Sequence, residues 1–494
     1  MRKAPLLMSV LALVLAGGAA PAQETVLTGV LSAIAPDARV SWDRGASQAG
    51  QETYEGLFVG QERVRVRGDQ VRVTPDGPVA RIEADRIVLN LDGDERFAVE
   101  MTGLSLIVPA SALSALRDGG PVPDLCFEEG AGVEIEARGV RIVRDIQVPD
   151  ARPVRAEAQA DLIRLTQEIR RSGPGCEVTL TGRADGAQES RSDKSGLRFD
   201  LFELTLTFPG NLETLTAAEA PDLTLALRFG GVIRQVPGGA SVVAVRDGSV
   251  EARITALGTV PVLTSLLRSR GAPAGDRIAG ALSALTPAEG RVSGAVNGAT
   301  LLVEALLPSG LISGLSRASL TSVIGDYAAE LEMRGGSATL MASSEVVGIG
   351  RTRIEAGLRL APRRPEGSEL GLGPLVDRAL PDIRLGWAAL THQDGGLLRA
   401  IELISGSPVS VLAAIFLKDG QEAVPEAWRP AARRAATELA RFFALTARGE
   451  GALLRLSTPQ DLSVPETYRL LTLRPELADQ LIVTEVTQAP PKGP

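Results

Sequence analysis

The only histidine of the chain, His392, is the residue on which most side-chain catalysis would depend. A Ser-His-Asp or Cys-His mechanism uses a histidine as its general base, and no strand-to-helix nucleophile elbow accompanies this one. It lies within Thr391-His392-Gln393-Asp394-Gly395, a turn-like sequence. We therefore predict that His392 occupies a solvent-exposed loop and that the chain has no catalytic histidine and no histidine metal site.

Two cysteines, Cys126 and Cys176, are the other reactive side chains. Together with one histidine they supply too few ligands for a zinc or haem site. In an oxidising compartment an isolated pair of cysteines is expected to form one disulfide bond. Two separate buried thiols are the alternative.

Carboxylates cluster at Asn90-Leu91-Asp92-Gly93-Asp94-Glu95, but without the spacing of a calcium-binding EF-hand loop. The cluster is typical of a hairpin tip. Paired carboxylates could also serve glycoside hydrolysis. Sugar sites need aromatic platforms, however, and the chain is only 3% aromatic. We expect Trp42, Trp387 and Trp428 to pack in cores, and we predict no catalytic residue, metal or cofactor.

The charge and composition argue against nucleic acid as a partner. The chain has a formal net charge of −8 and few aromatic residues. It therefore lacks the positive charge that neutralises phosphates and the rings on which bases stack.

The first residues have the three parts of a secretory signal peptide. Arg2 and Lys3 precede an apolar run from Leu6 to Leu15, and Ala20-Pro21-Ala22 fits the cleavage rule. We predict cleavage before Gln23, export to the periplasm, and no transmembrane segment in the mature chain.

Alternating apolar and polar residues then predict antiparallel strands with one covered face. The clearest stretch, 63–74, suggests a hairpin with a two-residue turn at Gly68-Asp69, which would place Val66 opposite Val71 and Val64 opposite Val73. A second hairpin would place Leu91 opposite Phe97 and Leu89 opposite Val99. The apolar side chains of these strands would share one face and are the candidate ligand-binding residues: Val64, Val66, Val71, Val73, Ile87, Leu89, Leu91, Phe97 and Val99.

The predicted fold class is α+β, mainly antiparallel β, built on a long curved β-meander without a fixed repeat period. The strongest predicted helix is 430–447, and a strand is expected at 452–457. The expected parts are a signal peptide (1–22), a β-meander domain (23–257), a helical connector (258–290), a second β region (291–361), a helix-rich C-terminal region (362–487) and a disordered tail (488–494).

The segment Ala38-Arg39-Val40-Ser41-Trp42-Asp43, the segment 53–59 and the strands of 63–108 resemble envelope proteins of the AsmA type. The resemblance is one of pattern and covers residues 24–360. It implies sheets that curl into a groove lined by apolar side chains, and hence lipid handling. AsmA-type proteins keep an N-terminal membrane anchor, whereas cleavage is predicted here.

Three hypotheses about function follow. The first is a non-enzymatic periplasmic envelope protein that binds or shields lipid or another apolar molecule in a curved sheet. The second is a structural or protein-interaction scaffold of the envelope, which would use exposed strand edges. The third and least favoured is a hydrolase.

Overall fold

The computed structural model describes most of residues 39–488. The described residues are 39–48, 50–61, 64–91, 97–117, 132–146, 154–172, 175–209, 222–255, 289–302, 322–361, 382–409, 411, 414–415, 418, 426, 429–448, 451–457, 470, 473–474, 477 and 483–488. The predicted signal peptide, nearly all of the predicted helical connector and residues 489–494 lie outside them.

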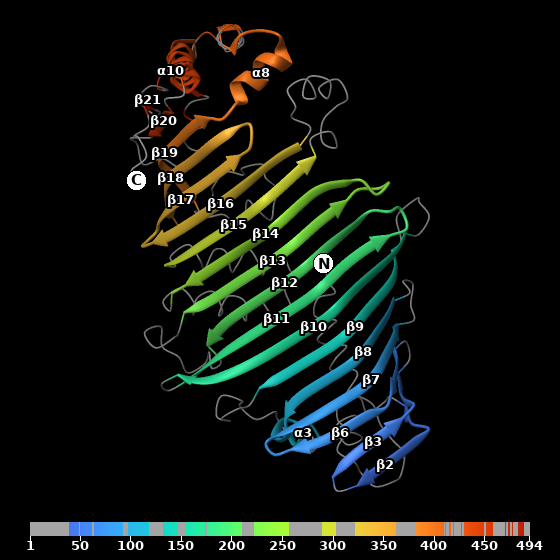
Figure 1. Cartoon of the computed structure of the whole chain (residues 1–494). Helices are drawn as coiled ribbons and strands as arrows, with labels where there is room; N and C mark the ends of the chain where they lie inside the picture. The colour runs from blue at the N-terminus through green and yellow to red at the C-terminus, as the bar shows by residue number, and fades with distance from the viewer. Residues whose placement is uncertain are drawn as a thin grey trace. The chain divides into compact units, whose positions relative to one another are not determined.

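The chain divides into two compact units. Unit 1 comprises residues 1–214 and 225–241, and unit 2 comprises residues 215–224 and 242–494. All strand pairings between described residues are antiparallel, and long strands outnumber helices (Figure 1). The predicted fold class, α+β with mainly antiparallel β structure, is therefore confirmed.

In the part of unit 1 that the structure describes, a meander of long strands is accompanied by the short helix α3 (Ala110–Arg117). From β7 to β12 each strand pairs with the next one in the chain. Its strands are β1 (Arg39–Ser41), β2 (Arg44–Gln48), β3 (Gln51–Glu55), β4 (Leu57–Gln61), β5 (Val64–Asp69), β6 (Val71–Asp76), β7 (Val79–Leu91), β8 (Phe97–Pro109), β9 (Val133–Ile146), β10 (Val154–Ser172), β11 (Gly175–Arg191), β12 (Gly196–Pro209) and most of β13 (Leu223–Gln235).

Unit 2 contains a second meander, followed by helices and two short strands. From β14 to β21 each strand pairs with the next. Its elements are nearly all of β14 (Ser241–Ile254), β15 (Gly290–Leu302), β16 (Ser322–Arg334), β17 (Ser337–Val346), β18 (Gly350–Ala361), β19 (Asp382–Asp394), α8 (Leu397–Ser405), α10 (Arg429–Ala447), β20 (Ala452–Ser457) and β21 (Val483–Gln488).

The C-terminal elements match the sequence in part. Helix α10 confirms the helix predicted at 430–447, and β20 confirms the strand predicted at 452–457. Strand β19 was missed, because 382–394 was assigned to a helix-rich region. Among the described residues, no helix has the length and apolarity needed to span a membrane.

The predicted hairpin at Gly68-Asp69 is wrong. Strands β5 and β6 do not pair with each other. Instead β5 pairs with the second half of β7 and β6 pairs with the first half. Val66 lies opposite Val59 and Leu89 rather than Val71. The other predicted hairpin is confirmed, with Leu91 opposite Phe97 and Leu89 opposite Val99.

The error arose because a bend in a single strand produces the same apolar pattern as a turn. At Gln70, between β5 and β6, φ is 52°, which is a left-handed conformation. The chain changes direction there without reversing, so Val66 and Val71 both remain on the covered face. Sequence alternation records the face of each side chain but not its partner strand.

Similar bends occur in several long strands of unit 1. In β8, Val99 and Met101 are buried before the bend and Leu104 and Leu106 after it, so the buried positions change from odd to even numbers. Gly103 lies between them with φ of 57°, and the pairing with β9 is irregular at this point. This is a β-bulge, and glycine takes the left-handed conformation without a Cβ clash.

The bends recur in β8, β9, β11 and β13, which is a repeat that the sequence did not reveal. An aspartate side chain in or next to a neighbouring strand often covers the bend glycine: Asp43 covers Gly56, Asp161 covers Gly186, and Asp200 covers Gly231. The left-handed residues at these bends in unit 1 are Gly56, Gln70, Gly103, Gly139, Gly186 and Gly231.

Unit 2 has a bend of the same kind. Gly298 has φ of 59°, and its backbone N–H donates a hydrogen bond of 2.7 Å to Oδ1 of Asp326. Because strands and loops differ in length, the bends fall at uneven intervals in the sequence. No fixed period therefore results.

Candidate functional site

The candidate ligand-binding residues of unit 1 lie in its hydrophobic core. Leu89 has no exposed surface, and Val73 is only 2% exposed. They belong to one cluster that reaches from Val40 on β1 to Ala160 on β10, with Trp42 packed against it. The members of the predicted set in this cluster are Val66, Val71, Val73, Ile87, Leu89 and Val99, with Phe97 at its margin.

Two members of the set, Val64 and Leu91, lie opposite each other at the strand ends. Their side chains are outside the described part of the chain. A ligand role for the set stays a prediction, but the buried members contact one another. They leave little surface for a second molecule.

An open apolar face occurs in unit 2, on strands β14 to β18. An open hollow of about 430 Å³ lies over them, lined by apolar and hydroxyl side chains and by no charged residue. Its floor is shallow where Gly294, Ala329 and Ala342 lie side by side on β15, β16 and β17. The larger side chains of Tyr327 and Ile354 are 39% and 44% exposed. We call this surface the apolar hollow.

The opposite face of the same strands is chemically different. A hollow of about 450 Å³ there is lined by Glu251, Glu330 and Arg353. Arg353 forms an ion pair with Glu355, and Glu330 forms one with Arg291 at 2.8 Å. Because side chains alternate between the faces of a strand, the uncharged side chains gather on one face and the charges on the other.

The apolar hollow continues into a covered core. Ile354 on β18 lies opposite Leu390 on β19, which lies opposite Leu454 on β20. Leu390 and Leu454 pack against a cluster that contains Phe442 of α10. One cross-strand apolar row is therefore covered by α10 at β19–β21 and open at β15–β18.

A hydroxyl row runs beside the apolar row. Tyr327, Ser344 and Thr352 lie opposite one another on β16, β17 and β18. Thr352 faces the hollow, and its Oγ1 is 3.0 Å from Nδ1 of His392. Polar atoms at one border of an otherwise apolar site would orient a ligand.

The predicted position of His392 is wrong. It lies in β19, between Thr352 and Ala452 on the neighbouring strands, and is 9% exposed. Alternation extends through the turn-like sequence 391–395 as far as Asp394, so the strand includes most of the residues that the polar composition assigned to a loop.

The group Thr352, His392 and Asp394 has the residue types of a catalytic triad but not its geometry. Nε2 of His392 is 3.9 Å from Oδ1 of Asp394 and has no hydrogen-bond partner among the described residues. The Asp394 carboxylate accepts hydrogen bonds of 3.2 Å from the backbone N–H groups of Gly396 and Leu398 at the start of α8. Thr352 lies within a regular strand rather than at an exposed turn. The contacts indicate a group that joins β18, β19 and α8.

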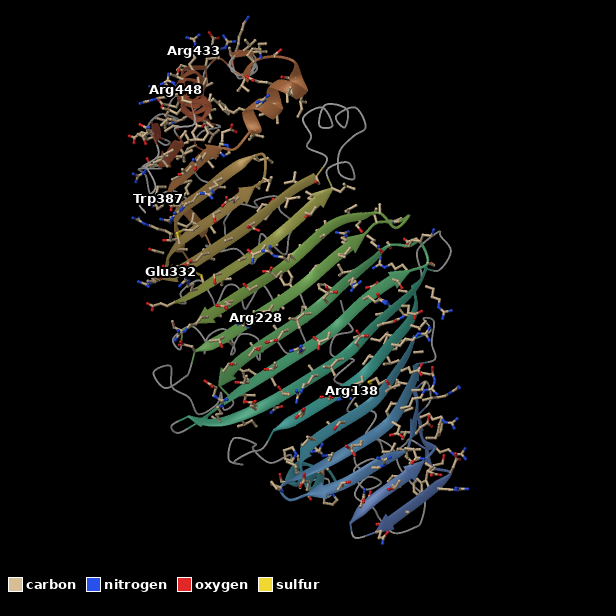
Figure 2. The ribbon with its side chains drawn as sticks, viewed as in Figure 1. Arg138, Arg228, Glu332, Trp387, Arg433 and Arg448 are labelled. Atoms are coloured by element: carbon tan, nitrogen blue, oxygen red, sulfur yellow. The ribbon has the colours of Figure 1, made fainter. Side chains whose placement is uncertain are left out.

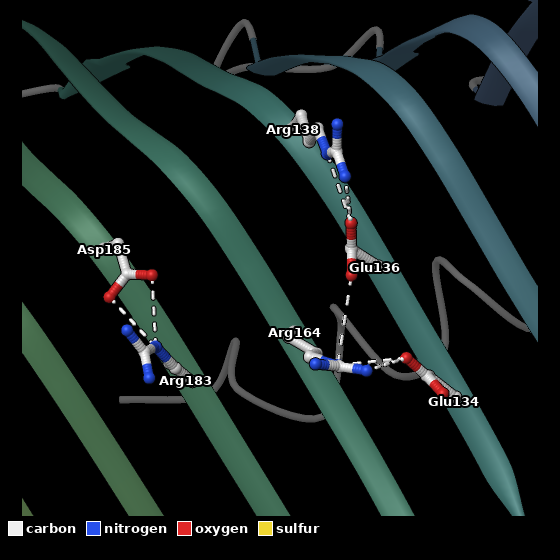
Figure 3. Close-up of polar contacts among 6 residues, drawn as sticks. All are labelled: Glu134, Glu136, Arg138, Arg164, Arg183 and Asp185. Atoms are coloured by element: carbon white, nitrogen blue, oxygen red, sulfur yellow. Dashed lines mark hydrogen bonds and ion pairs between the residues drawn. The ribbon is translucent and has the colours of Figure 1, made fainter.

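The polar face of unit 1 carries paired charges (Figure 3). Arg164 donates a hydrogen bond of 2.9 Å from Nε to Glu134, and Arg138 forms a 3.0 Å ion pair with Glu136. Across β9 and β10, the hydrogen bond from Arg141 holds the pKa of Glu157 below its ordinary value. These charges neutralise one another, so this face has no strong attraction for a charged partner.

Cys176 is 1% exposed and packs with Val178, and it is not a free thiol. Cys126 lies outside the described residues, so the bond between the two cysteines stays a prediction. The Asn90–Glu95 cluster is also mostly outside them, and the described residues contain no group of three or more His, Cys, Asp or Glu that could hold a metal. Trp42 packs edge-on against Tyr54, Trp387 lies beside Arg455, and Trp428 is not described.

Comparison with known proteins supplies no family for this chain. No protein-family model matches it, and no curated protein matches its sequence.

Proposed function

We propose that this protein is a non-enzymatic binding protein of the periplasm that holds an apolar ligand, of the kind represented by a lipid acyl chain, in the apolar hollow of unit 2. The observation that carries the proposal is the cross-strand apolar row. Helix α10 covers this row at Leu390, and the row is open at Ile354 on the next strand. The covered part buries its apolar side chains against the helix. The open part needs an apolar molecule for the same gain in free energy.

The size and composition of the hollow support this ligand class. Small-molecule sites occupy roughly 300–1,000 Å³ and are mostly apolar with a few polar groups. The apolar hollow is about 430 Å³ and has Tyr327, Ser344 and Thr352 at one border. Export, a periplasmic location and the AsmA-type resemblance are part of the proposal and agree with a role in handling envelope lipids.

The experiment compares two neighbouring alanines on β16. Ala329 faces the apolar hollow, opposite Gly294 and Ala342, whereas Ala328 faces the charged side, opposite Ala295 and Ser343. Both are exposed. Ala329→Phe should fill the hollow, and Ala328→Phe should add the same side chain to the other face.

Lipids that co-purify with the exported protein would be identified by mass spectrometry, and binding of a fluorescent fatty acid would be titrated. We expect Ala329→Phe to lower both by at least tenfold and Ala328→Phe to leave both within about twofold of the unsubstituted protein. Equal losses in the two variants, or no lipid and no fatty-acid binding in the parent protein, would contradict the proposal. Cleavage before Gln23 would be checked by mass analysis of the mature N-terminus.

A further inference from the structure

The exposed side of α10 is strongly basic. Arg429, Arg433 and Arg441 within the helix are exposed, as is Arg448 directly after it. The only acidic residue of the helix is Glu438, whose Oε2 accepts a hydrogen bond of 3.0 Å from the backbone N–H of Val486. The single carboxylate is therefore directed to the sheet, and the outer side carries positive charge only.

The spacing places these arginines on one side of the helix. Arg441 and Arg448 are seven residues apart, which is two turns and about 10 Å along the axis. Between the arginines the exposed positions hold short side chains, including Thr437, Ala440 and Ala444. The guanidinium groups of Arg433 and Arg448 extend from the outside of the helix (Figure 2). A side of this kind can approach a flat surface closely. We call it the basic face of α10.

These arginines differ from those of unit 1. Among the described residues, Arg429, Arg433, Arg441 and Arg448 form no ion pair with a carboxylate, whereas Arg141, Arg164 and Arg183 each have one. An unpaired positive face stands out in a chain whose net charge is −8. Guanidinium groups bind phosphate oxygens in a bidentate manner, which makes a phosphate-bearing partner the best fit.

Exposed apolar side chains in the same unit distinguish a lipid surface from a nucleic acid. In the chain between β19 and α10, Leu403 is 48% exposed, Val411 46% and Ile415 52%. Aliphatic side chains of this kind insert between lipid headgroups, whereas nucleic-acid surfaces use aromatic rings and polar side chains. We propose that the basic face of α10 binds the anionic headgroups of a phospholipid membrane surface.

This inference is independent of the proposed function, because a lipid surface can be bound whether or not the hollow takes a ligand. The test uses the full mature protein and two triple variants of equal charge. Arg433→Gln, Arg441→Gln and Arg448→Gln remove charge from the basic face, and glutamine preserves helix propensity. Arg141→Gln, Arg164→Gln and Arg183→Gln remove the same charge from the paired face of unit 1.

Co-sedimentation would be measured with phosphatidylcholine vesicles with and without phosphatidylglycerol. We expect the parent protein to bind only the anionic vesicles and to bind them less well as salt is raised. The α10 variant should bind about 100-fold more weakly, because each arginine near an anionic surface strengthens binding roughly fivefold. The unit 1 variant should change by no more than about threefold.

Three results would overturn the proposal. They are no binding of the parent protein to anionic vesicles, equal losses in the two triple variants, and displacement of the vesicles by a DNA oligonucleotide or by inorganic phosphate at lower concentration than the lipid. The first two results would show that the basic face of α10 does not bind a lipid surface. The third would show that it binds phosphate groups from another source. Circular dichroism of each variant establishes that α10 remains folded.

Discussion

The carboxylate of Asp161 on β10 covers Gly186 on the adjacent strand β11, so closely that a Cβ added to the glycine would lie 2.1 Å from Oδ2. With φ of 60°, Gly186 is also in a conformation that other residues rarely adopt. The bend of β11 and the position of this aspartate therefore depend on each other.

We predict that Gly186→Ala destabilises the protein more than Gly77→Ala. Gly77 has nearly the same φ, 59°, but no atom within 4 Å of an added Cβ. Backbone strain alone should cost about 1–2 kcal/mol at either position, and the contact with Asp161 adds to it only at Gly186. Urea denaturation measures both. Combining Gly186→Ala with Asp161→Ala should recover the added loss, and equal losses in the two single variants would contradict the role of the contact.

A second prediction concerns the closed face of unit 1 and the open face of unit 2. Leu89→Glu places a carboxylate where no surface is exposed and should cost several kcal/mol, with loss of cooperative folding. Ile354→Glu makes the same change at a side chain that is 44% exposed, where water can reach the charge. It should leave the circular dichroism spectrum intact and weaken fatty-acid binding. A folded Leu89→Glu protein would show that this face is hydrated.

A third prediction concerns His392, which the sequence placed in an exposed loop and the structure places within β19. His392→Ala should lower the free energy of unfolding by about 1–3 kcal/mol, because it leaves a gap within β19 and removes the partner of Thr352. Thr352→Val removes the same hydrogen bond while keeping the strand shape, and it should cost less. Chemical denaturation of both variants measures these changes in the free energy of unfolding. A change within about 0.5 kcal/mol for His392→Ala is what an exposed loop position would give.

A fourth prediction concerns pH. The side-chain amide of Asn297 donates a hydrogen bond of 2.6 Å to Asp247, and this bond, together with Arg246, holds the pKa of Asp247 below its ordinary value. Because the pKa is lower in the folded state, the ionised carboxylate stabilises the fold at pH values above the unfolded pKa of about 3.9. This stabilisation is lost as the pH falls through the pKa of the folded state. Asn297→Ala should raise the pKa of Asp247, as measured by NMR titration of the carboxyl carbon. Ser293→Ala, on the same strand, should not.

Much of the fold could be predicted from the sequence. The faces of the strands, the hairpin that joins Leu91 to Phe97, and helix α10 each follow from local periodicity, which depends on neighbouring residues only. The partners of β5 and β6 did not follow, because a bend at Gln70 and a turn at Gly68-Asp69 give the same alternation. Pairing with β7 is decided by residues that are distant in sequence.

The candidate site was harder to predict than the fold. A closed core and an open groove are lined by the same aliphatic residues, so Leu89 and Ile354 look alike in the sequence although one is buried and the other is 44% exposed. The signals that could have found the apolar hollow are the small residues Gly294, Ala329 and Ala342, whose meaning depends on their alignment across three strands. The basic face of α10 could be predicted from the sequence, since the helix has several arginines and a single glutamate.

The bends within several long strands have a consequence for how the chain can change in length. Because buried positions in β8 switch from Met101 to Leu104 across Gly103, the two halves of the strand keep their own alternation. A residue inserted within one half would turn every side chain between it and the strand end to the wrong face. A residue inserted at the bend would only enlarge a bulge that already exists. Natural variants of this chain should therefore gain and lose single residues at the bends and in the loops, while the straight halves keep a constant length.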